Sequence, residues 1–153
     1  MDRHHAMNAT RVSYTLESTL ASVNKAEQAA AEVAAKSCFD PDDCGRIAMA
    51  VREATVNAIL HGNRYDPSKR VTVSFESTAE ALTVAVRDEG AGLDPTTLPN
   101  PLAPENLLKQ SGRGIFLIQA FMDKVHFQNL SPGNEITMVK FIRAPGRSSK
   151  QGG

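Results

Sequence analysis

The sequence has few of the residues and segments that define several large protein classes. It contains two cysteines, Cys38 and Cys44, and no tryptophan, and aromatic residues make up only 5% of its 153 positions. Two cysteines cannot form a disulfide framework, and their spacing is typical of neither a zinc site nor a redox motif. We therefore expect both to be packing residues in a reduced, cytoplasmic protein.

Charge and hydrophobic runs exclude further classes. The 17 basic and 17 acidic residues cancel, so the chain lacks the basic excess of nucleic-acid-binding proteins and we expect no direct nucleic-acid contact. No apolar run approaches the roughly 20 residues that cross a bilayer, and no apolar signal region follows the N-terminus. We expect neither a membrane partner nor secretion.

What is present is the composition of a globular protein, with 41% hydrophobic and 22% charged residues. This length fits one domain with a sizeable core better than two. We expect a single domain over residues 10–143, with flexible tails over 1–9 and 144–153, the second of which is rich in Gly, Ser and Lys.

Hydrophobic periodicity predicts the order of the elements. We expect an edge strand at 12–16, helices over 18–36 and 41–61, strands near 71–75 and 82–86, a helix over 112–123, and a hairpin of 125–128 with 135–142. Residues 93–111 contain four prolines and little periodicity, which is typical of a functional or disordered loop. This order predicts an α/β (α+β) two-layer sandwich, with a mixed, mainly antiparallel sheet and helices on one face.

A polar pair lies near the end of the second predicted helix. Glu53 and Asn57 are four residues apart and share a helix face with the apolar Met49, Val56 and Leu60. Among apolar neighbours, burying either polar group without a hydrogen-bonding or ionic partner would cost free energy. An amide oxygen is a suitable Mg²⁺ ligand, and a carboxylate can accept a proton. Taken alone, such a pair is more often incidental, because polar i,i+4 pairs are common on helices.

Two glycine-containing turns complete the set. Asp88, at the end of a strand, can accept a hydrogen bond from an exocyclic amine, and Gly90 and Gly92 would let the backbone pass close to a ring. An ordinary strand-ending turn explains this segment equally well.

The second turn lies at the start of the third predicted helix. Gly112 and Gly114 would expose backbone N–H groups at a helix N-terminus, where phosphate binds, and Lys109 and Arg113 would add positive charge. Arg113 equally fits a surface salt bridge, and a lone Gly-x-Gly is weak evidence.

Together, in this order, the three motifs resemble the ATP-binding boxes of the GHKL superfamily, which includes gyrase, heat-shock-90, histidine kinase and mismatch-repair ATPases. The local sequences of five segments are similar to those of bacterial anti-sigma-factor serine/threonine kinases, and the resemblance covers about residues 10–143. These segments are 53–63, 86–92, 104–108, 111–118 and 122–123.

The resemblance implies a Bergerat-type ATP-binding fold with a long ATP lid over residues 93–111 and Mg²⁺ and ATP as cofactors. In such a protein Glu53 would be the general base, Asn57 the metal ligand and Asp88 the residue that binds adenine. The remaining nucleotide-binding positions would be Gly90, Gly92, Lys109, Gly112, Arg113 and Gly114.

Members of this family typically bind a sigma factor and phosphorylate a serine or threonine of an anti-anti-sigma protein of the STAS fold, and many are homodimers. Two alternatives stay open. One is a nucleotide-gated regulator that binds a partner without significant kinase activity. The other is the catalytic domain of a histidine kinase, which the acidic Glu53 and the lack of an upstream helical hairpin with a phospho-accepting histidine disfavour.

Overall fold

The computed structural model describes residues 9–90 and 114–143. Five strands form one sheet in the order β1-β2-β3-β5-β4. The strands are β1 (Thr10–Glu17), β2 (Arg70–Ser77), β3 (Ala81–Arg87), β4 (Lys124–Asn129) and β5 (Asn134–Phe141). All four pairings are antiparallel, whereas the sequence predicted a mixed, mainly antiparallel sheet.

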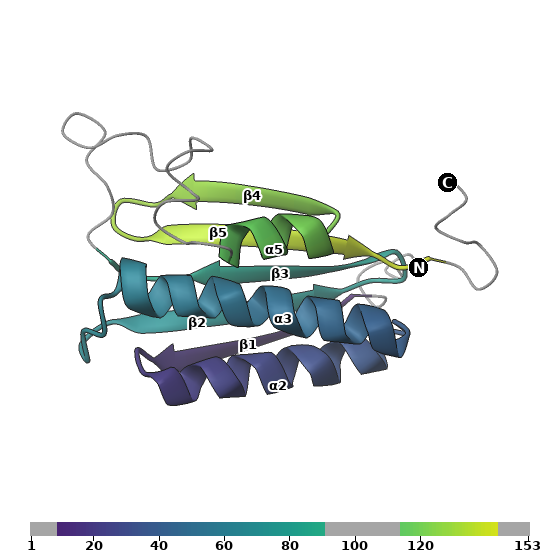
Figure 1. The fold of residues 1–153 in the computed structure, drawn as a ribbon, viewed down its shortest axis with the longest axis horizontal. Coiled ribbons are helices and arrows are strands. Elements are labelled where there is room, and N and C mark those ends of the chain that lie inside the picture. Colours follow the sequence, from purple (N-terminus) through teal and green to yellow (C-terminus); the bar gives the residue numbers. More distant parts are fainter. Residues whose placement is uncertain (1–8, 91–113, 144–153) are drawn as a thin grey trace, which may run out of the picture.

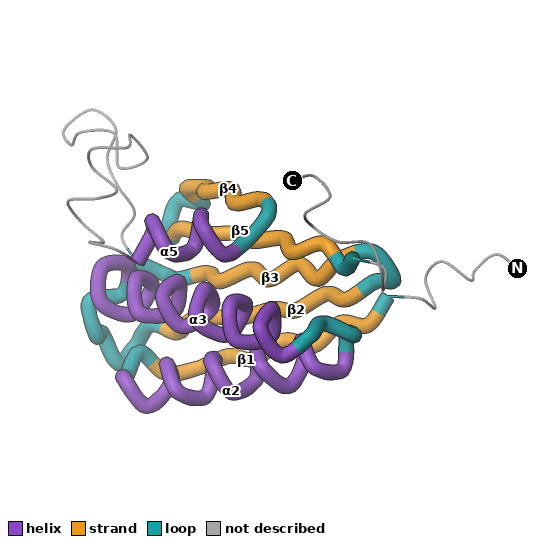
Figure 2. Tube along the Cα trace, turned by 45° about the vertical axis from the view of Figure 1, so that its right-hand side comes forward, coloured by secondary structure: helices purple, strands orange, loops and turns teal. Residues whose placement is uncertain are grey.

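The helices lie together on one face of this sheet (Figures 1 and 2). They are α2 (Leu20–Lys36), α3 (Pro41–Asn57), the π-helical turn η1 (Ala58–Gly62) and α5 (Gly114–Phe121). The predicted element order and two-layer α+β architecture are therefore confirmed, with β1 at the sheet edge as expected. None of the described helices is long and apolar enough to cross a membrane.

Strict alternation builds the sheet side of the core. Val71, Val73 and Phe75 of β2 are buried, and the register places Val86 opposite Val73 and Val84 opposite Phe75. Directly opposed residues point to the same face, so the buried set of each strand faces the helices while its polar neighbours face outward.

Helix α3 starts where the sequence provides a start signal. The Asp40 carboxylate accepts a 2.8 Å hydrogen bond from the backbone N–H of Asp43, and Pro41 occupies the first helical position. Asp42 and Asp43 place negative charge at the positive end of the helix dipole. The cap fixes the start of the helix that carries Glu53 and Asn57 at its other end.

The end of α3 was expected to be α-helical but is a π turn. The N–H of Asn63 donates to the carbonyl of Ala58 at 2.8 Å, which closes a wider ring than an α-helix does. Arg64 and Tyr65 follow with left-handed φ values of 52° and 60°, a conformation that costs energy for residues other than glycine. The chain thereby leaves the helix and turns sharply toward β2.

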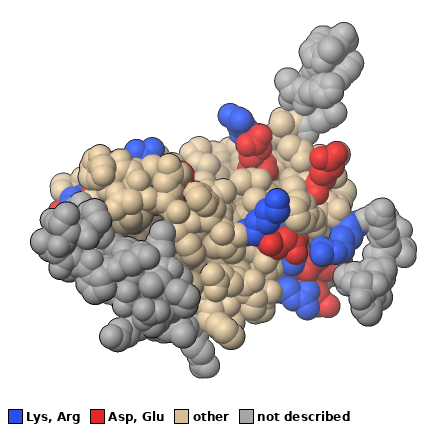
Figure 3. Space-filling view, turned by 90° about the horizontal axis from the view of Figure 1, so that it is seen from above, with Lys and Arg blue, Asp and Glu red and all other residues tan. Residues whose placement is uncertain are grey.

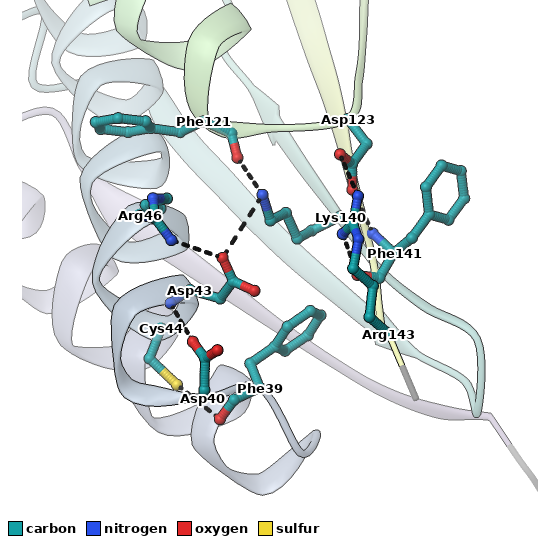
Figure 4. A network of polar contacts seen from close by, with 10 residues as sticks. All are labelled: Phe39, Asp40, Asp43, Cys44, Arg46, Phe121, Asp123, Lys140, Phe141 and Arg143. Atoms are coloured by element: carbon teal, nitrogen blue, oxygen red, sulfur yellow. Dashed lines mark hydrogen bonds and ion pairs between the residues drawn. The ribbon is translucent and has the colours of Figure 1, made fainter. Parts of the chain in front are cut away.

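A lysine occupies a core-facing position of β5. Lys140 is only 8% exposed, and its Nζ donates a 2.7 Å hydrogen bond to the carbonyl of Phe121, the last residue of α5 (Figure 4). The same Nζ lies 3.8 Å from Asp43 Oδ1, which also pairs with Arg46 at 3.0 Å. A cation here binds an unpaired carbonyl at the negative end of α5 and links β5 to the start of α3.

Surface charges are mixed. On the face seen in Figure 3, acidic and basic side chains of the described residues lie beside one another rather than in one extended patch of a single sign. The expectation that both cysteines pack inside is wrong for Cys38, which is exposed, whereas Cys44 is half-buried against the core. Cys38 has a left-handed φ of 70° in the turn after α2, and this turn directs it outward.

Candidate functional site

Glu53 and Asn57 meet the first residue of α5. A Cβ placed on Gly114 would lie 2.9 Å from Glu53 Oε1 and 3.8 Å from Asn57 Nδ2. Because Gly114 has no side chain, the start of α5 can lie against the Glu53 carboxylate. The structure thus brings together three of the predicted residues, which come from helices far apart in the sequence.

The apolar neighbours of this pair do not bury it. Met49 and Leu60 are 37% and 41% exposed, and Glu53 and Asn57 are only half-buried. The pair is therefore not in the buried apolar environment in which both groups would need a partner. The helical face is at the surface, so both side chains are accessible to a ligand.

Asp88 lies just beyond the end of β3 and is only 6% exposed. Its Oδ1 accepts hydrogen bonds from the N–H groups of Gly90 at 2.9 Å and Asn134 at 3.2 Å. Its own N–H donates to the Asn134 carbonyl at 2.9 Å. Oδ2 receives no hydrogen bond from any residue that the structure describes.

Three glycines surround Asp88 closely. A Cβ on Gly62, at the end of η1, would collide with the Asp88 carboxyl group, and one on Gly90 would collide with the Gly62 carbonyl. Gly133, whose φ is +93°, packs against the Asp88 backbone, where a Cβ would collide with the Asp88 carbonyl. Any side chain at these three positions would collide with its neighbours, so glycine is what lets the three segments pack closely around Asp88.

Burial changes the acidity of Asp88. Removal from water raises the pKa of its carboxyl group above the ordinary value of 3.8, and the hydrogen bonds from Gly90 and Asn134 oppose this without cancelling it. A buried carboxyl group with one unused oxygen is suited to bind a donor such as an amine.

Asn63 was not predicted to be part of the site. It is 2% exposed, and its Oδ1 accepts a 2.8 Å hydrogen bond from the N–H of Glu89. Its Nδ2 donates to Ser18 Oγ at 2.9 Å and to the Arg70 carbonyl at 3.0 Å. The signals in the sequence were its place at the end of the family-like segment 53–63 and an amide directly after His61-Gly62, which equally fits a helix cap.

Several predicted positions lie outside the described residues. These are Gly92, Lys109, Gly112, Arg113 and the proposed lid over 93–111. Glu53, Asn57, Asp88, Gly90 and Gly114 are described, and they lie around the C-terminal end of α3 and η1.

The donor set fits a nucleotide with a hard cation. Among the described residues, no group of three or more His, Cys, Asp or Glu side chains could hold a metal ion. Mg²⁺ takes oxygen ligands and is usually held by one or two protein groups together with ligand phosphates and water. Asn57 offers an amide oxygen and is half-buried at the surface of α3.

This fold and this arrangement have counterparts among known proteins. The sequence profile described as "Histidine kinase-like ATPase domain" matches residues 16–140, so the chain belongs to that family. The chain is also 30% identical over 116 residues to the serine-protein kinase RsbW of Bacillus licheniformis, and the match covers 72% of each protein. It is 32% identical over 111 residues to the anti-sigma F factor of Anoxybacillus flavithermus, over 68% of this chain and 75% of that protein.

A solved structure shares the fold. The crystal structure of the RsbU and RsbW domains of Rv1364c from Mycobacterium tuberculosis superimposes with a TM-score of 0.65 at 18% identity. The match covers 88% of this chain and 33% of that one, so the chain spans about a third of that protein. The Bergerat-type fold and the resemblance to anti-sigma-factor kinases are confirmed.

Proposed function

We propose that this chain is a cytoplasmic, ATP-binding protein serine/threonine kinase of the anti-sigma-factor type. It transfers the ATP γ-phosphate to a serine or threonine of an anti-anti-sigma partner of the STAS fold, and it sequesters a sigma factor. The observation that carries the proposal is the meeting of Glu53 and Asn57 with Gly114, at the end of the helix that reaches Asp88 through Gly62. The similarity to a serine-protein kinase and an anti-sigma F factor supports it.

Each residue has a defined task in this proposal. Asp88 Oδ2 accepts a hydrogen bond from the exocyclic amine of adenine, and Gly90 and Gly92 let the base lie close to the backbone. Asn57 holds Mg²⁺ through its amide oxygen. When bound, Mg²⁺ supplies charge neutralisation between the phosphates. Gly112 and Gly114 offer backbone N–H groups to the phosphates, with Lys109 and Arg113 adding positive charge.

Glu53 is the proposed general base. Its carboxylate accepts the proton of the partner hydroxyl while the hydroxyl oxygen bonds to the γ-phosphorus. The bond from phosphorus to the β,γ-bridging oxygen breaks, and ADP leaves with that electron pair. The Glu53 carboxylate lies beside Gly114, one of the residues proposed to hold the phosphates, and this supports its role as the base.

Nucleotide binding is tested by thermal unfolding with Mg-ATP on wild type and Asp88→Asn. A ligand at 100 times its Kd stabilises the native state by about 2.7 kcal/mol, so wild type should melt at a higher temperature with Mg-ATP. Asp88→Asn should lose this shift. Asp42→Asn, an exposed position at the far end of α3, makes the same chemical change as a matched control and should keep it.

Phosphotransfer is tested with radiolabelled ATP and a STAS-fold partner. Glu53→Gln should abolish label transfer while Mg-ATP still raises the melting temperature, and the control Glu32→Gln on the exposed side of α2 should transfer label as wild type does. Full transfer by Glu53→Gln removes Glu53 from its role. ATP binding and partner capture without transfer by wild type would favour the nucleotide-gated regulator. Sedimentation of the purified chain tests the homodimer that the resemblance implies.

A further inference from the structure

We infer that Asn63 is the residue that positions Asp88, by joining the end of the α3–η1 helix to the turn after β3. This inference rests on the proposed function and deepens it, because it names the part of the fold that sets adenine recognition. Asn63 is a positioning residue, since its side chain acts through the backbone of Glu89 and Asp88.

The contacts run between two adjacent residue pairs. Gly62 packs its backbone against the Asp88 carboxyl group, and the next residue, Asn63, accepts the hydrogen bond of the next N–H along the turn, that of Glu89. Gly62 and Asn63, at the end of the helix, thus contact the consecutive turn residues Asp88 and Glu89. This double contact fixes where the turn lies relative to α3, while the N–H groups of Gly90 and Asn134 orient the Asp88 carboxylate within it.

A second hydrogen-bonded pair reinforces the first. Glu89 Oε1 accepts a 2.7 Å hydrogen bond from the N–H of Arg70, and Asn63 Nδ2 donates to the carbonyl of that same residue. Ser18 Oγ, which accepts the other Nδ2 hydrogen, donates in turn to the Lys69 carbonyl at 2.6 Å. The start of β2 is therefore a shared anchor for Asn63 and for the turn.

The chemistry of these partners favours asparagine. The site offers one N–H donor and two oxygen acceptors, Ser18 Oγ and the Arg70 carbonyl, to a side chain that is almost fully buried. An amide supplies one acceptor and two hydrogens in one rigid plane, which satisfies all three. A carboxylate would keep the acceptor and lose both donors, and alanine would leave every partner unsatisfied.

The backbone beside this contact has an unusual conformation. The helix ends in a π turn, and two consecutive non-glycine residues, Arg64 and Tyr65, adopt left-handed φ values. Such conformations persist where surrounding contacts over-determine them, and they cluster at functional sites. Here the hydrogen bond to Asn63 Oδ1, together with the packing of Gly62, ties this segment to the Asp88 turn.

The experiment compares the affinities of ATP and inosine triphosphate, which lacks the amine that Asp88 is proposed to bind. Asn63→Ala should weaken ATP binding about tenfold or more and inosine triphosphate binding far less, so the preference for ATP falls. Asn24→Ala makes the same change at an exposed residue of α2, so its ATP preference should equal that of wild type. Asn63→Asp, which keeps the acceptor, should restore most of the preference despite lower stability.

A ligand-free readout separates the inference from the proposed function. Amide hydrogen exchange at Glu89 and Gly90 should speed up in Asn63→Ala and stay slow in the control Asn24→Ala. If wild type binds no nucleotide, the proposed function fails, and exchange alone still decides whether Asn63 holds the turn. Unchanged exchange and an unchanged ATP preference in Asn63→Ala would overturn the inference, as would an equal loss for both nucleotides. If Asn63→Ala does not fold, the milder Asn63→Ser replaces it in both measurements.

Discussion

Gly62 is a position where one added methyl group should disturb the Asp88 carboxyl group directly. Its φ is not left-handed, so alanine fits its backbone, but the new Cβ would collide with the Asp88 carboxyl group. The carboxyl group cannot move without giving up the hydrogen bonds from Gly90 and Asn134. We therefore expect Gly62→Ala to displace Asp88 from this position.

The magnitude follows from those two hydrogen bonds. Hydrogen bonds to a charged group contribute about 1.5–3 kcal/mol each. The displaced carboxylate regains water, and alanine is a better helix former than glycine, which together offset part of the loss. We expect the free energy of unfolding to fall by about 2–4 kcal/mol, and Mg-ATP to lose its stabilising effect.

Gly45→Ala is the matched control. Gly45 is an exposed residue of α3, and a Cβ there would meet nothing within 4 Å. The same substitution should therefore stabilise the protein by about 0.5–1 kcal/mol through backbone entropy and helix propensity. Urea unfolding followed by circular dichroism measures both variants under one condition.

A double-mutant cycle tests the stated cause. In an Asp88→Ala background the carboxyl group is gone, so Gly62→Ala should cost much less than in wild type. The reasoning is refuted if Gly62→Ala is as stable as Gly45→Ala, or if its cost is the same with and without the Asp88 carboxyl group.

Three further expectations concern stability. Because burial raises the pKa of Asp88 above 3.8, its contribution to stability is complete below that value and is lost as pH rises through the raised folded pKa. Asp88→Asn should thus gain stability over wild type across this window in urea unfolding at stepped pH, and a constant difference would contradict the burial argument. Lys140→Met keeps the apolar stem but removes the charged donor to Phe121, so unfolding free energy should fall by about 1.5–3 kcal/mol; an unchanged value would show that the network contributes nothing. Asp40→Ala removes the cap of α3 and should cost about 1 kcal/mol, with Asp40→Asn close to wild type as the control.

Local patterns were sufficient for the elements. Alternation in 71–75 and 82–86 predicted β2 and β3, and Asp40-Pro41 predicted the start of α3, because period and capping depend on near neighbours alone. The π turn at 58–62 was not predicted, since its wider hydrogen-bond ring is set by contacts with the Asp88 turn, which follows a separate strand. The burial of Lys140 was likewise not predicted, because its partners lie on α5 and α3.

The sequence by itself determined the order of helices and strands. It also contained the polar pair Glu53 and Asn57 and the glycine turns, whose residues resemble those of a known ATP-binding family. Only the tertiary structure decided that Glu53 contacts Gly114 and that Gly62 packs against the Asp88 carboxyl group. Only the tertiary structure made Asn63 the link between helix and turn. The physical reason is that spacing along one helix fixes which side chains share a face, whereas burial and unused hydrogen-bonding groups depend on segments that meet only after the sheet has formed.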